Sequence, residues 1–394
     1  MSGARSAPPL DPVALAQALI RCESVTPIEA GALTLLQETL ERAGFKCHRM
    51  TFTEPGTADV ENLYARFGSE GPNLCFAGHT DVVPPGDEAA WTAPPFAAEI
   101  RDGVLYGRGA VDMKGAVACY VAAALQYLAT RGGKVKGSLS FLVTGDEEGA
   151  SVNGTIKVLD WLKARGEKLD ACIVGEPSSQ ATVGDEIKIG RRGSLNGELV
   201  VKGKQGHAAY PHVADNPLPK LARMLDRLAN LRLDAGTEHF EPSHIALTIV
   251  SVPNTASNVI PAQARAVFNI RYNDAHTRTK IEQRIAECCR AAAAEVGAQY
   301  TLSFSGTGDV FLTKPGPLVE AMVNAAREVT GHSAKLTTTG GTSDARFIKD
   351  YCPVVELGLV NATIHQVDER VPVADLATLT QIYARFIERF FATA

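Results

Sequence analysis

The chain has 394 residues, of which 45% are hydrophobic and 21% charged, with a formal net charge of -5 and a sequence pI of about 6.0. This composition is typical of a globular enzyme, and the length predicts two domains, since one domain takes roughly 100–200 residues. The acidic balance and the lack of a long basic run exclude an ordinary nucleic-acid-binding protein. The eight cysteines form no Cys-x-x-Cys pair, and the N-terminus lacks the apolar core of a secretory signal. We therefore expect reduced thiols and a cytoplasmic protein without a membrane-spanning segment.

Helical patterns and short apolar runs alternate over the first half of the chain. Helices are predicted over residues 11–22, 31–44 and 114–130, and strands over residues 46–53, 60–67, 73–77, 138–144 and 171–174. This alternation predicts an α/β domain with a mostly parallel sheet flanked by helices. Polar residues cluster just after the predicted strands, at the edge where open α/β sheets bind their ligands.

The pattern changes at residue 189. Strands and helices then follow in the order β-α-β-β-α-β, over residues 195–202, 216–231, 245–252, 262–272, 278–296 and 299–304. That order predicts a ferredoxin-like α+β domain inserted over residues 189–304. The first pattern resumes with helices over 317–329 and 373–392 and a strand over 353–357. We therefore expect a discontinuous catalytic domain made of residues 1–188 and 305–394.

Two histidines and three carboxylates near the ends of predicted strands are candidate metal ligands: His79, Asp112, Glu148, Glu176 and His365. Each has an ordinary alternative. A lone histidine is more often a hydrogen-bonded structural residue, and Asp112 suits the N-cap of the next helix. Glu176 stands in a Gly-Glu-Pro turn, and the acids at 146–148 would form a solvated loop.

Convergence of these five residues at one sheet edge favours the metal interpretation. Mixed histidine and carboxylate ligands suit zinc, with cobalt or manganese as substitutes. Five ligands exceed the needs of one catalytic ion and suit two ions that share a bridging carboxylate. Asp81 lies two residues after His79, where its carboxylate could accept the second ring N–H and fix the tautomer. Its alternative is a surface turn residue.

Together these stretches resemble the co-catalytic dizinc peptidase and amidohydrolase family, which includes aminoacylases, acetylornithine deacetylases, glutamate carboxypeptidases and succinyl-diaminopimelate desuccinylases. The matching motifs are Gly-His-Thr-Asp-Val-Val-Pro (78–84), Tyr-Gly-Arg-Gly-Ala-Val-Asp-Met-Lys-Gly (106–115), Gly-Asp-Glu-Glu-Gly (145–149) and Val-Gly-Glu-Pro (174–177). Their order matches the family over nearly the whole chain.

The resemblance implies two Zn²⁺ per subunit, with Co²⁺ as a substitute in one site, bridged by Asp112. It assigns His79 and Glu176 to one ion. Glu148 and His365 are assigned to the other. It further implies that Glu147 is the general base, that Asp81 orients His79, and that the peptide between Asp112 and Met113 is cis.

Stretches at 189–194, 205–217, 257–261, 339–348 and 361–369 resemble the desuccinylase branch of that family. The branch implies N-succinyl-L,L-2,6-diaminopimelate as the substrate and a homodimer formed through the inserted domain. His207, as an oxyanion donor, and Asn258 would reach the active site of the partner subunit. The other implied substrate contacts are Arg191, Arg192, Ser194, Tyr210, Arg271, Gly341, Thr342 and Asn361.

Arginine forks suit the carboxylates of such a substrate. Taken alone, His207 would be an exposed loop histidine, Arg192 and Arg271 would form surface ion pairs, and residues 337–342 would be a flexible loop. Three other functions remain open: an acetylornithine deacetylase-like amidohydrolase, a dipeptidase or carboxypeptidase, and a non-catalytic metal-bound binding protein. The presence of Glu147 beside all five candidate ligands argues against the last.

Overall fold

A computed structural model describes residues 10–393 and divides the chain into two compact units. The first unit contains the chain up to Ile189, Thr313–Thr337 and the chain from Ser343 onward; the second contains Gly190–Leu312 and Thr338–Thr342. The second unit extends past the predicted boundary at residue 304. The extension arises because β15 (Gln299–Gly308) continues and β16 (Phe311–Leu312) pairs with β9 (Gly190–Arg191). At the junction, Thr313 N donates to Ile189 O over 2.6 Å.

The first unit is built on an eight-stranded sheet in the order β1-β2-β6-β3-β7-β18-β8-β17. The strands are β1 (Lys46–Phe52), β2 (Val60–Phe67), β3 (Asn73–His79), β6 (Ser138–Thr144), β7 (Ala171–Val174), β8 (Glu186–Lys188), β17 (Lys335–Thr337) and β18 (Val354–Glu356). The central strands β6, β3, β7 and β18 are mutually parallel, whereas β1, β2 and β8 pair antiparallel with their inner neighbours. The predicted mostly parallel α/β sheet is confirmed.

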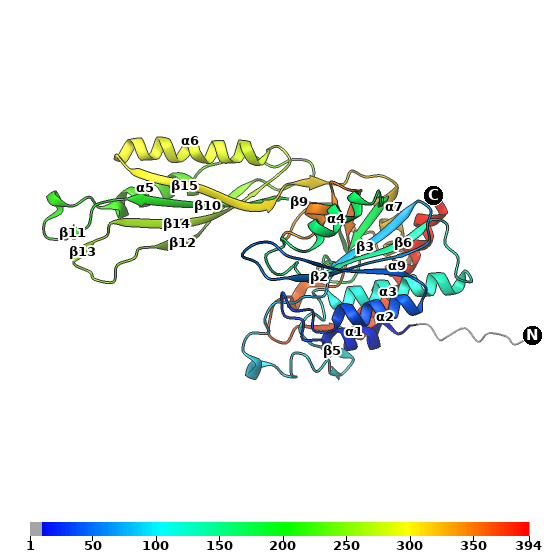
Figure 1. Cartoon of the computed structure of the whole chain (residues 1–394). Helices are drawn as coiled ribbons and strands as arrows, with labels where there is room; N and C mark the ends of the chain where they lie inside the picture. Colours follow the sequence, from blue (N-terminus) through cyan, green and yellow to red (C-terminus); the bar gives the residue numbers. More distant parts are fainter. Residues whose placement is uncertain (1–9, 394) are drawn as a thin grey trace, which may run out of the picture. The chain divides into compact units, whose positions relative to one another are not determined.

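Helices cover both faces of this sheet (Figure 1). The helices are α1 (Pro12–Ile20), α2 (Ala32–Arg42), α3 (Lys114–Thr130), α4 (Thr155–Ala164), α7 (Pro317–Thr330), α8 (Ala345–Ile348) and α9 (Val373–Thr393). Tyr120 of α3 stacks on Phe76 at 4.2 Å and meets Phe141 edge-on. Trp161 of α4 contacts Tyr64, which is paired with the residue after Phe141 and so points to the opposite face.

Helix α3 is the buried centre of its layer, because alanine and other small residues let α1 and α9 pack closely against it. A smaller sheet lies beside its N-terminus and has the order β19-β5-β4. Its strands are β4 (Ile100–Arg101), β5 (Val104–Tyr106) and β19 (Arg370–Pro372). Short 3-10 turns, η1 (Glu88–Ala90) and η3 (Asn361–Thr363), complete the unit.

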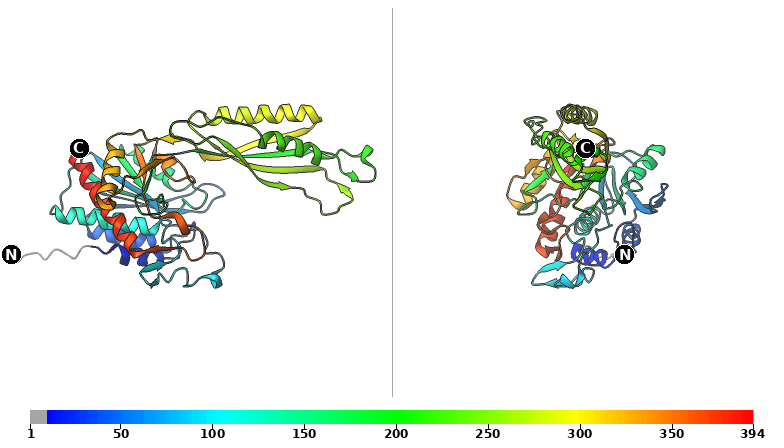
Figure 2. Two further views of the ribbon diagram at one scale, coloured as in Figure 1. Left: turned by 180° about the vertical axis from the view of Figure 1, so that it is seen from behind. Right: turned by 90° about the vertical axis from the view of Figure 1, so that its left-hand side faces the viewer.

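The second unit contains an antiparallel sheet in the order β12-β14-β10-β15, covered on one face by α5 and α6 (Figure 2). Its elements are β10 (Gly193–Lys202), α5 (Pro217–Ala229), β12 (His244–Ser251), β14 (Gln263–Tyr272) and α6 (Arg278–Val296), with β15 last. Alternate residues of β10 and β14, such as Leu199 and Phe268, are buried against the helices. Chain order and strand order together confirm the predicted ferredoxin-like arrangement.

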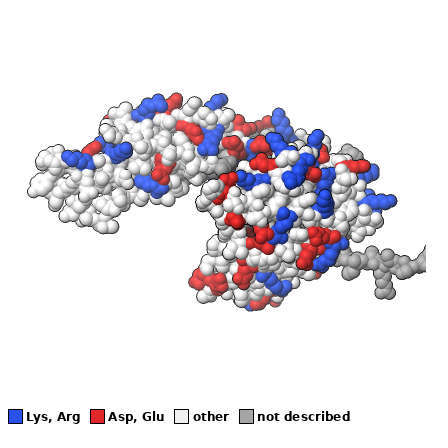
Figure 3. Space-filling model, viewed as in Figure 1, with Lys and Arg blue, Asp and Glu red and all other residues white. Residues whose placement is uncertain are grey.

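Short elements extend the end of this sheet beyond the C-terminus of β10: β11 (Gly206–His207), η2 (Pro211–Val213) and β13 (Val259–Ile260), with β11 paired to β13. Among the described residues, no helix is long and apolar enough to cross a membrane. Acidic and basic side chains are intermixed on the face drawn in Figure 3 rather than gathered by sign. The predicted helices and strands are present. Not expected from the sequence were α4, α8, β8 and β17, together with the two- or three-residue strands β4, β5, β9, β11, β13, β16 and β19.

Candidate active site

Four candidate residues converge because they lie at the ends of neighbouring parallel strands. His79 ends β3, the loop after β6 carries Glu147 and Glu148, and Glu176 lies just beyond β7. His79 is paired with Thr144 at the end of β6. The carboxyl ends of parallel strands meet at one sheet edge, and β3 lies between β6 and β7, so these side chains come together.

The positions of Asp112 and His365 differ from the prediction, because neither residue directly follows a strand of the central sheet. Asp112 lies in the turn before α3, and His365 lies in the loop after η3. The N-cap of α3 is Met113, without a side-chain cap, so the alternative of Asp112 as an N-cap is wrong. The predicted cis peptide between Asp112 and Met113 is present.

The Asp112 carboxylate lies between the two histidines. Its Oδ1 is 3.2 Å from His79 Nε2, and its Oδ2 is 3.3 Å from His365 Nε2. Glu176 Oε1 lies 3.7 Å from His79 Nε2, and Glu148 Oε1 lies 2.9 Å from His365 Nε2. One carboxylate therefore faces two ring nitrogens, each with a second carboxylate beside it.

These groups fit divalent cations. Ligand atoms of His79, Asp112 and Glu148 lie within 4.8 Å of one another, as do those of His79, Glu147 and Glu176. Glu176 Oε1 is buried and has no hydrogen-bond partner among the described residues. Burial, together with the charges of Asp112 and other neighbouring acids, raises the pKa of Glu147 and of Glu176 well above the usual range. A bound cation would offset this crowding of negative charge.

Asp81 is fully buried, and its carboxylate organises the loop that carries the acids. Its Oδ1 accepts from Glu147 N at 3.3 Å, and its Oδ2 accepts from Glu148 N at 3.0 Å. His79 Nδ1 is 2.8 Å from the Asp81 main-chain oxygen and 3.6 Å from its carboxylate. The partner of the His79 ring is thus the main-chain oxygen rather than the predicted carboxylate. The alternative of a surface turn residue for Asp81 is wrong.

Three candidate arginines gather in the second unit. Arg191 Nη1 donates to Gly341 O at 3.0 Å, and Arg192 lies 3.3 Å from Glu241. Burial and the charges of Arg192 and Arg191 lower the pKa of Arg271, whose Nη1 is buried without a hydrogen-bond partner in the described chain. Ser194 is paired with Arg271 across β10 and β14, and Thr342 lies against Gly308 of the same unit. Crowded cations of this kind suit an anionic ligand.

His207, Tyr210 and Asn258 form a separate group at the other end of β10. The His207 and Tyr210 rings are 5.7 Å apart, and Asn258 O accepts from Ala208 N at 2.9 Å. Ser194 lies near the start of the ten-residue β10, and His207 follows its end. The length of β10, at roughly 3.3 Å per residue, therefore separates His207 from the arginines within one chain.

Asn361 belongs to the first unit, where its main-chain N donates to Ser179 O. A further residue near the site, Glu369, was not singled out by the sequence motifs. Its fully buried carboxylate accepts from the Asp112 main-chain N at 3.0 Å. Its place at the end of the stretch at 361–369, four residues after His365, is the sequence signal that could have identified it.

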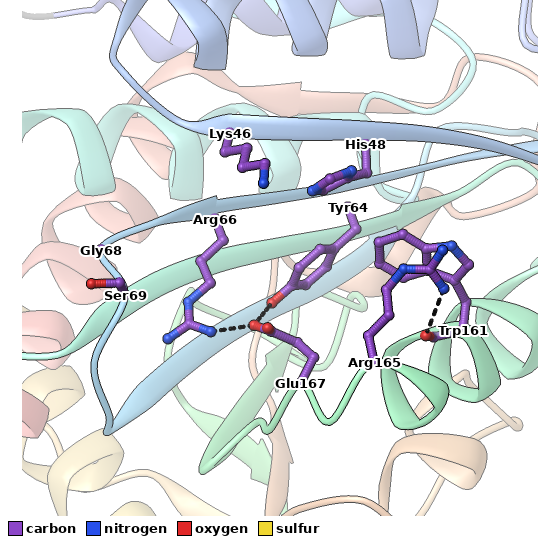
Figure 4. A pocket seen from close by; sticks show the side chains of 9 residues that line it. All are labelled: Lys46, His48, Tyr64, Arg66, Gly68, Ser69, Trp161, Arg165 and Glu167. Atoms are coloured by element: carbon purple, nitrogen blue, oxygen red, sulfur yellow. Dashed lines mark hydrogen bonds and ion pairs between the residues drawn. The ribbon is translucent and has the colours of Figure 1, made fainter.

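A hollow in the first unit, lined by other residues, does not share the chemistry of the candidate metal site. Its volume is about 380 Å³. Lys46, Arg66 and Arg165 lie around it with Trp161 (Figure 4). Among the residues that line it, Glu167 is the one carboxylate, and it already accepts from Arg66 and Tyr64. The hollow therefore offers no free acid for metal binding or base chemistry.

Comparison with known proteins agrees with this geometry. The model of the peptidase family M20/M25/M40 matches residues 75–389. The succinyl-diaminopimelate desuccinylases of Bradyrhizobium sp. (strain ORS 278) and Rhodospirillum centenum are each 58% identical to the chain, over 97% and 98% of its length and 100% and 98% of theirs.

Solved structures with the same fold include a tripeptidase from Staphylococcus aureus, with a TM-score of 0.79, 20% identity and coverage of 99% of this chain and 100% of that one. A metallo-carboxypeptidase from Sulfolobus solfataricus has a TM-score of 0.78 at 18% identity, covering 97% and 99%. The catalytic motifs, the arrangement around Asp112 and these matches lead to one conclusion: the chain belongs to peptidase family M20/M25/M40.

Proposed function

We propose that this protein hydrolyses the N-succinyl amide of N-succinyl-L,L-2,6-diaminopimelate to succinate and L,L-diaminopimelate, a step of lysine and diaminopimelate biosynthesis. One observation carries the hydrolase assignment: the Asp112 carboxylate faces His79 and His365 from its two oxygens, with Glu147 alongside. The substrate follows from relatives that are 58% identical over nearly the full length and are named succinyl-diaminopimelate desuccinylases.

The proposed cofactor is a pair of Zn²⁺ ions, with Co²⁺ as a substitute in one site. His79 and Glu176 would hold one ion, and Glu148 and His365 the other, with Asp112 between them. The buried Oε1 of Glu176, which accepts no hydrogen bond in the described chain, supports this assignment. When bound, such cations polarise the scissile carbonyl and increase the acidity of the attacking water.

Glu147 is the proposed general base. It would take a proton from the attacking water and return it to the departing amine nitrogen, which makes the amine a better leaving group. Its raised pKa, caused by burial and neighbouring carboxylates, favours a group that can both accept and hold a proton. Asp81 would keep Glu147 in position through the main chain.

Substrate binding is assigned to the second unit and to Asn361. Arg192 and Arg271 would pair with substrate carboxylates, since guanidinium groups match them bidentately, and Arg191 would support the Gly341 segment. Ser194, Tyr210, Gly341, Thr342 and Asn361 are the proposed hydrogen-bonding contacts.

The proposed assembly is a homodimer through the second unit, in which His207 and Asn258 serve the active site of the partner subunit. Strand β12 supports this proposal, because it is an edge strand whose Leu247, Ile249 and Val250 side chains are exposed. Exposed apolar edge strands favour pairing with another chain. A cytoplasmic location completes the proposal, and the eight free cysteines agree with a reducing compartment.

The test is succinate release from the proposed substrate by zinc-loaded protein. N-acetylornithine, a dipeptide and a chelated sample serve as controls. Chelator-sensitive turnover of the succinyl substrate alone is the expected result. Cleavage of acetylornithine or the dipeptide instead would contradict the substrate, and turnover that survives complete metal removal would contradict the metal chemistry.

A further inference from the structure

Glu369 is a buried carboxylate between two segments that supply candidate metal ligands. Its side chain is fully buried, as is that of its ion-pair partner Arg108, which is 2% exposed. Glu369 directly precedes β19 and follows His365 by four residues. Neither Glu369 nor Arg108 belongs to the proposed ligands, base or substrate contacts.

Each carboxylate oxygen of Glu369 accepts two hydrogen bonds from the turn that contains Asp112. Oε2 accepts from Arg108 Nη1 at 2.7 Å and from Gly109 N at 2.9 Å. Oε1 accepts from Val111 N at 2.8 Å and from Asp112 N at 3.0 Å. Because hydrogen bonds to an ionised carboxylate are short and strong, this single side chain fixes the main chain of residues 109–112.

The main chain of Glu369 is tied to the same region from the other direction. Its carbonyl oxygen accepts from Gly107 N at 2.9 Å, and the next residue, Arg370, is paired with Tyr106 in the small sheet. The Thr363 hydroxyl both donates to and accepts from the Arg370 main chain, which closes the turn that contains His365. Movement of Glu369 would therefore displace Asp112 and His365 relative to each other.

We propose that Glu369 is a positioning residue that sets the separation of Asp112 and His365 and thereby the affinity of the metal site that they share with Glu148. The inference rests on the proposed two-zinc centre and adds a residue that touches neither metal nor substrate. Residues that orient metal ligands typically change metal affinity about 10–100-fold when substituted.

The test variant is Glu369→Gln, which keeps the side-chain volume but turns one acceptor oxygen into an amide that faces N–H donors. Zinc binding to the wild type and the variant is measured by competition with a chelator of known affinity. The expected result is about a 10–100-fold loss of affinity for one of the two ions, with a smaller effect on the other.

Asp234→Asn is the matched control. Asp234 in the second unit is also a carboxylate that holds a loop, and it accepts from Gly236 N, Ser243 N, the Asn273 amide and the His276 ring. Its substitution should lower stability without changing zinc affinity.

Thermal unfolding with and without zinc separates positioning from a merely structural role. A structural role lowers the apo and zinc-loaded transitions equally. A positioning role also reduces the amount by which zinc increases the free energy of unfolding, by about 1.4 kcal/mol for each tenfold loss of affinity. If Glu369→Gln does not fold, Glu369→Asp, which keeps the charge but is shorter, decides the matter by the same titration.

Unchanged zinc affinity in a folded Glu369 variant would overturn this inference and leave the proposed metal centre intact. Failure of the wild type to bind two ions would overturn both. Loss of affinity in the Glu369 variant but not in Asp234→Asn supports the positioning role.

Discussion

At the scale of single residues, Glu147 and Glu148 are adjacent in sequence but differ in their surroundings. Glu148 is 2.9 Å from His365, whereas Glu147 groups with His79 and Glu176. Both main-chain N–H groups bond to Asp81, so the main chain that carries the two side chains is held in place. Neighbours of the same type can therefore serve different chemical purposes.

Substitution of Glu147 and of Glu148 should have different effects on catalysis and on metal content. Glu147→Gln is expected to lower kcat by about 10²–10⁴-fold, because the proton acceptor is lost, while two zinc ions remain bound. Glu148→Gln should lose one ion. Metal analysis and steady-state kinetics on the same samples measure both outcomes. Full activity of Glu147→Gln would contradict its role as base.

Arg271→Met should raise KM for the succinyl substrate on the order of 10–100-fold, with a smaller change in kcat, because a charged hydrogen bond to a substrate carboxylate is lost. Arg265→Met is the matched control, since Arg265 lies on the same strand and pairs with the half-buried Glu198. Equal effects of the two substitutions would argue against a substrate contact for Arg271.

The sequence could indicate the five candidate ligands because all five stand in short local motifs. It could not indicate the role of Glu369, because that role depends on main-chain groups more than 250 positions away. Nor could it give the main-chain partner of His79. Such contacts leave no periodic pattern in the sequence.

At the scale of elements, predictions succeeded where burial is regular. Strand β6 is buried throughout, and α3 is apolar on nearly all sides, so both were evident from composition and length. Strands β8 and β17 have three residues each, too few to show a period, and α4 begins without a side-chain N-cap. These elements depend on tertiary packing instead.

The loop between α5 and β12 is held by Asp234. Burial alone would raise the pKa of Asp234, but hydrogen bonds from Ser243, Gly236 and Asn273 lower it below its usual range. The stabilisation is therefore present above the unfolded-state pKa of about 3.9 and is lost as pH falls toward the folded-state value.

Asp234→Asn should consequently be less stable than the wild type at pH 6, and the difference should narrow below about pH 4. Urea unfolding of both proteins across this range measures the effect. A difference in unfolding free energy that stays constant down to pH 2 would contradict the assigned cause.

At the scale of the whole molecule, the proposed dimer is assigned to the exposed edge strand β12. Val250→Asp should convert the proposed dimer into a monomer of 41.8 kDa, because a carboxylate would be buried at an apolar interface. Ile28→Asp, at an exposed apolar site in the first unit, should leave the mass unchanged. Sedimentation measures both. A wild type that is monomeric at assay concentrations would refute the dimer.

Mixing inactive variants tests whether subunits share active sites. In random dimers of Glu147→Gln and His207→Ala, one site of each mixed dimer would contain both native residues, so about a quarter of wild-type activity should return. No recovery after subunit exchange would mean that His207 does not act across the interface.

The hydrogen bond between Thr313 N and Ile189 O has an evolutionary consequence. The chain leaves the first unit after Ile189 and returns to it at Thr313, and these two residues are adjacent in space. The intervening residues 190–312 therefore form a separable insertion. Because the two ends of the insertion point are adjacent in the first unit, the inserted segment can be exchanged, enlarged or deleted with little cost in loop-closure entropy. Related proteins could therefore differ in the second unit, to which substrate contacts are assigned, while they keep the first unit and its metal ligands unchanged.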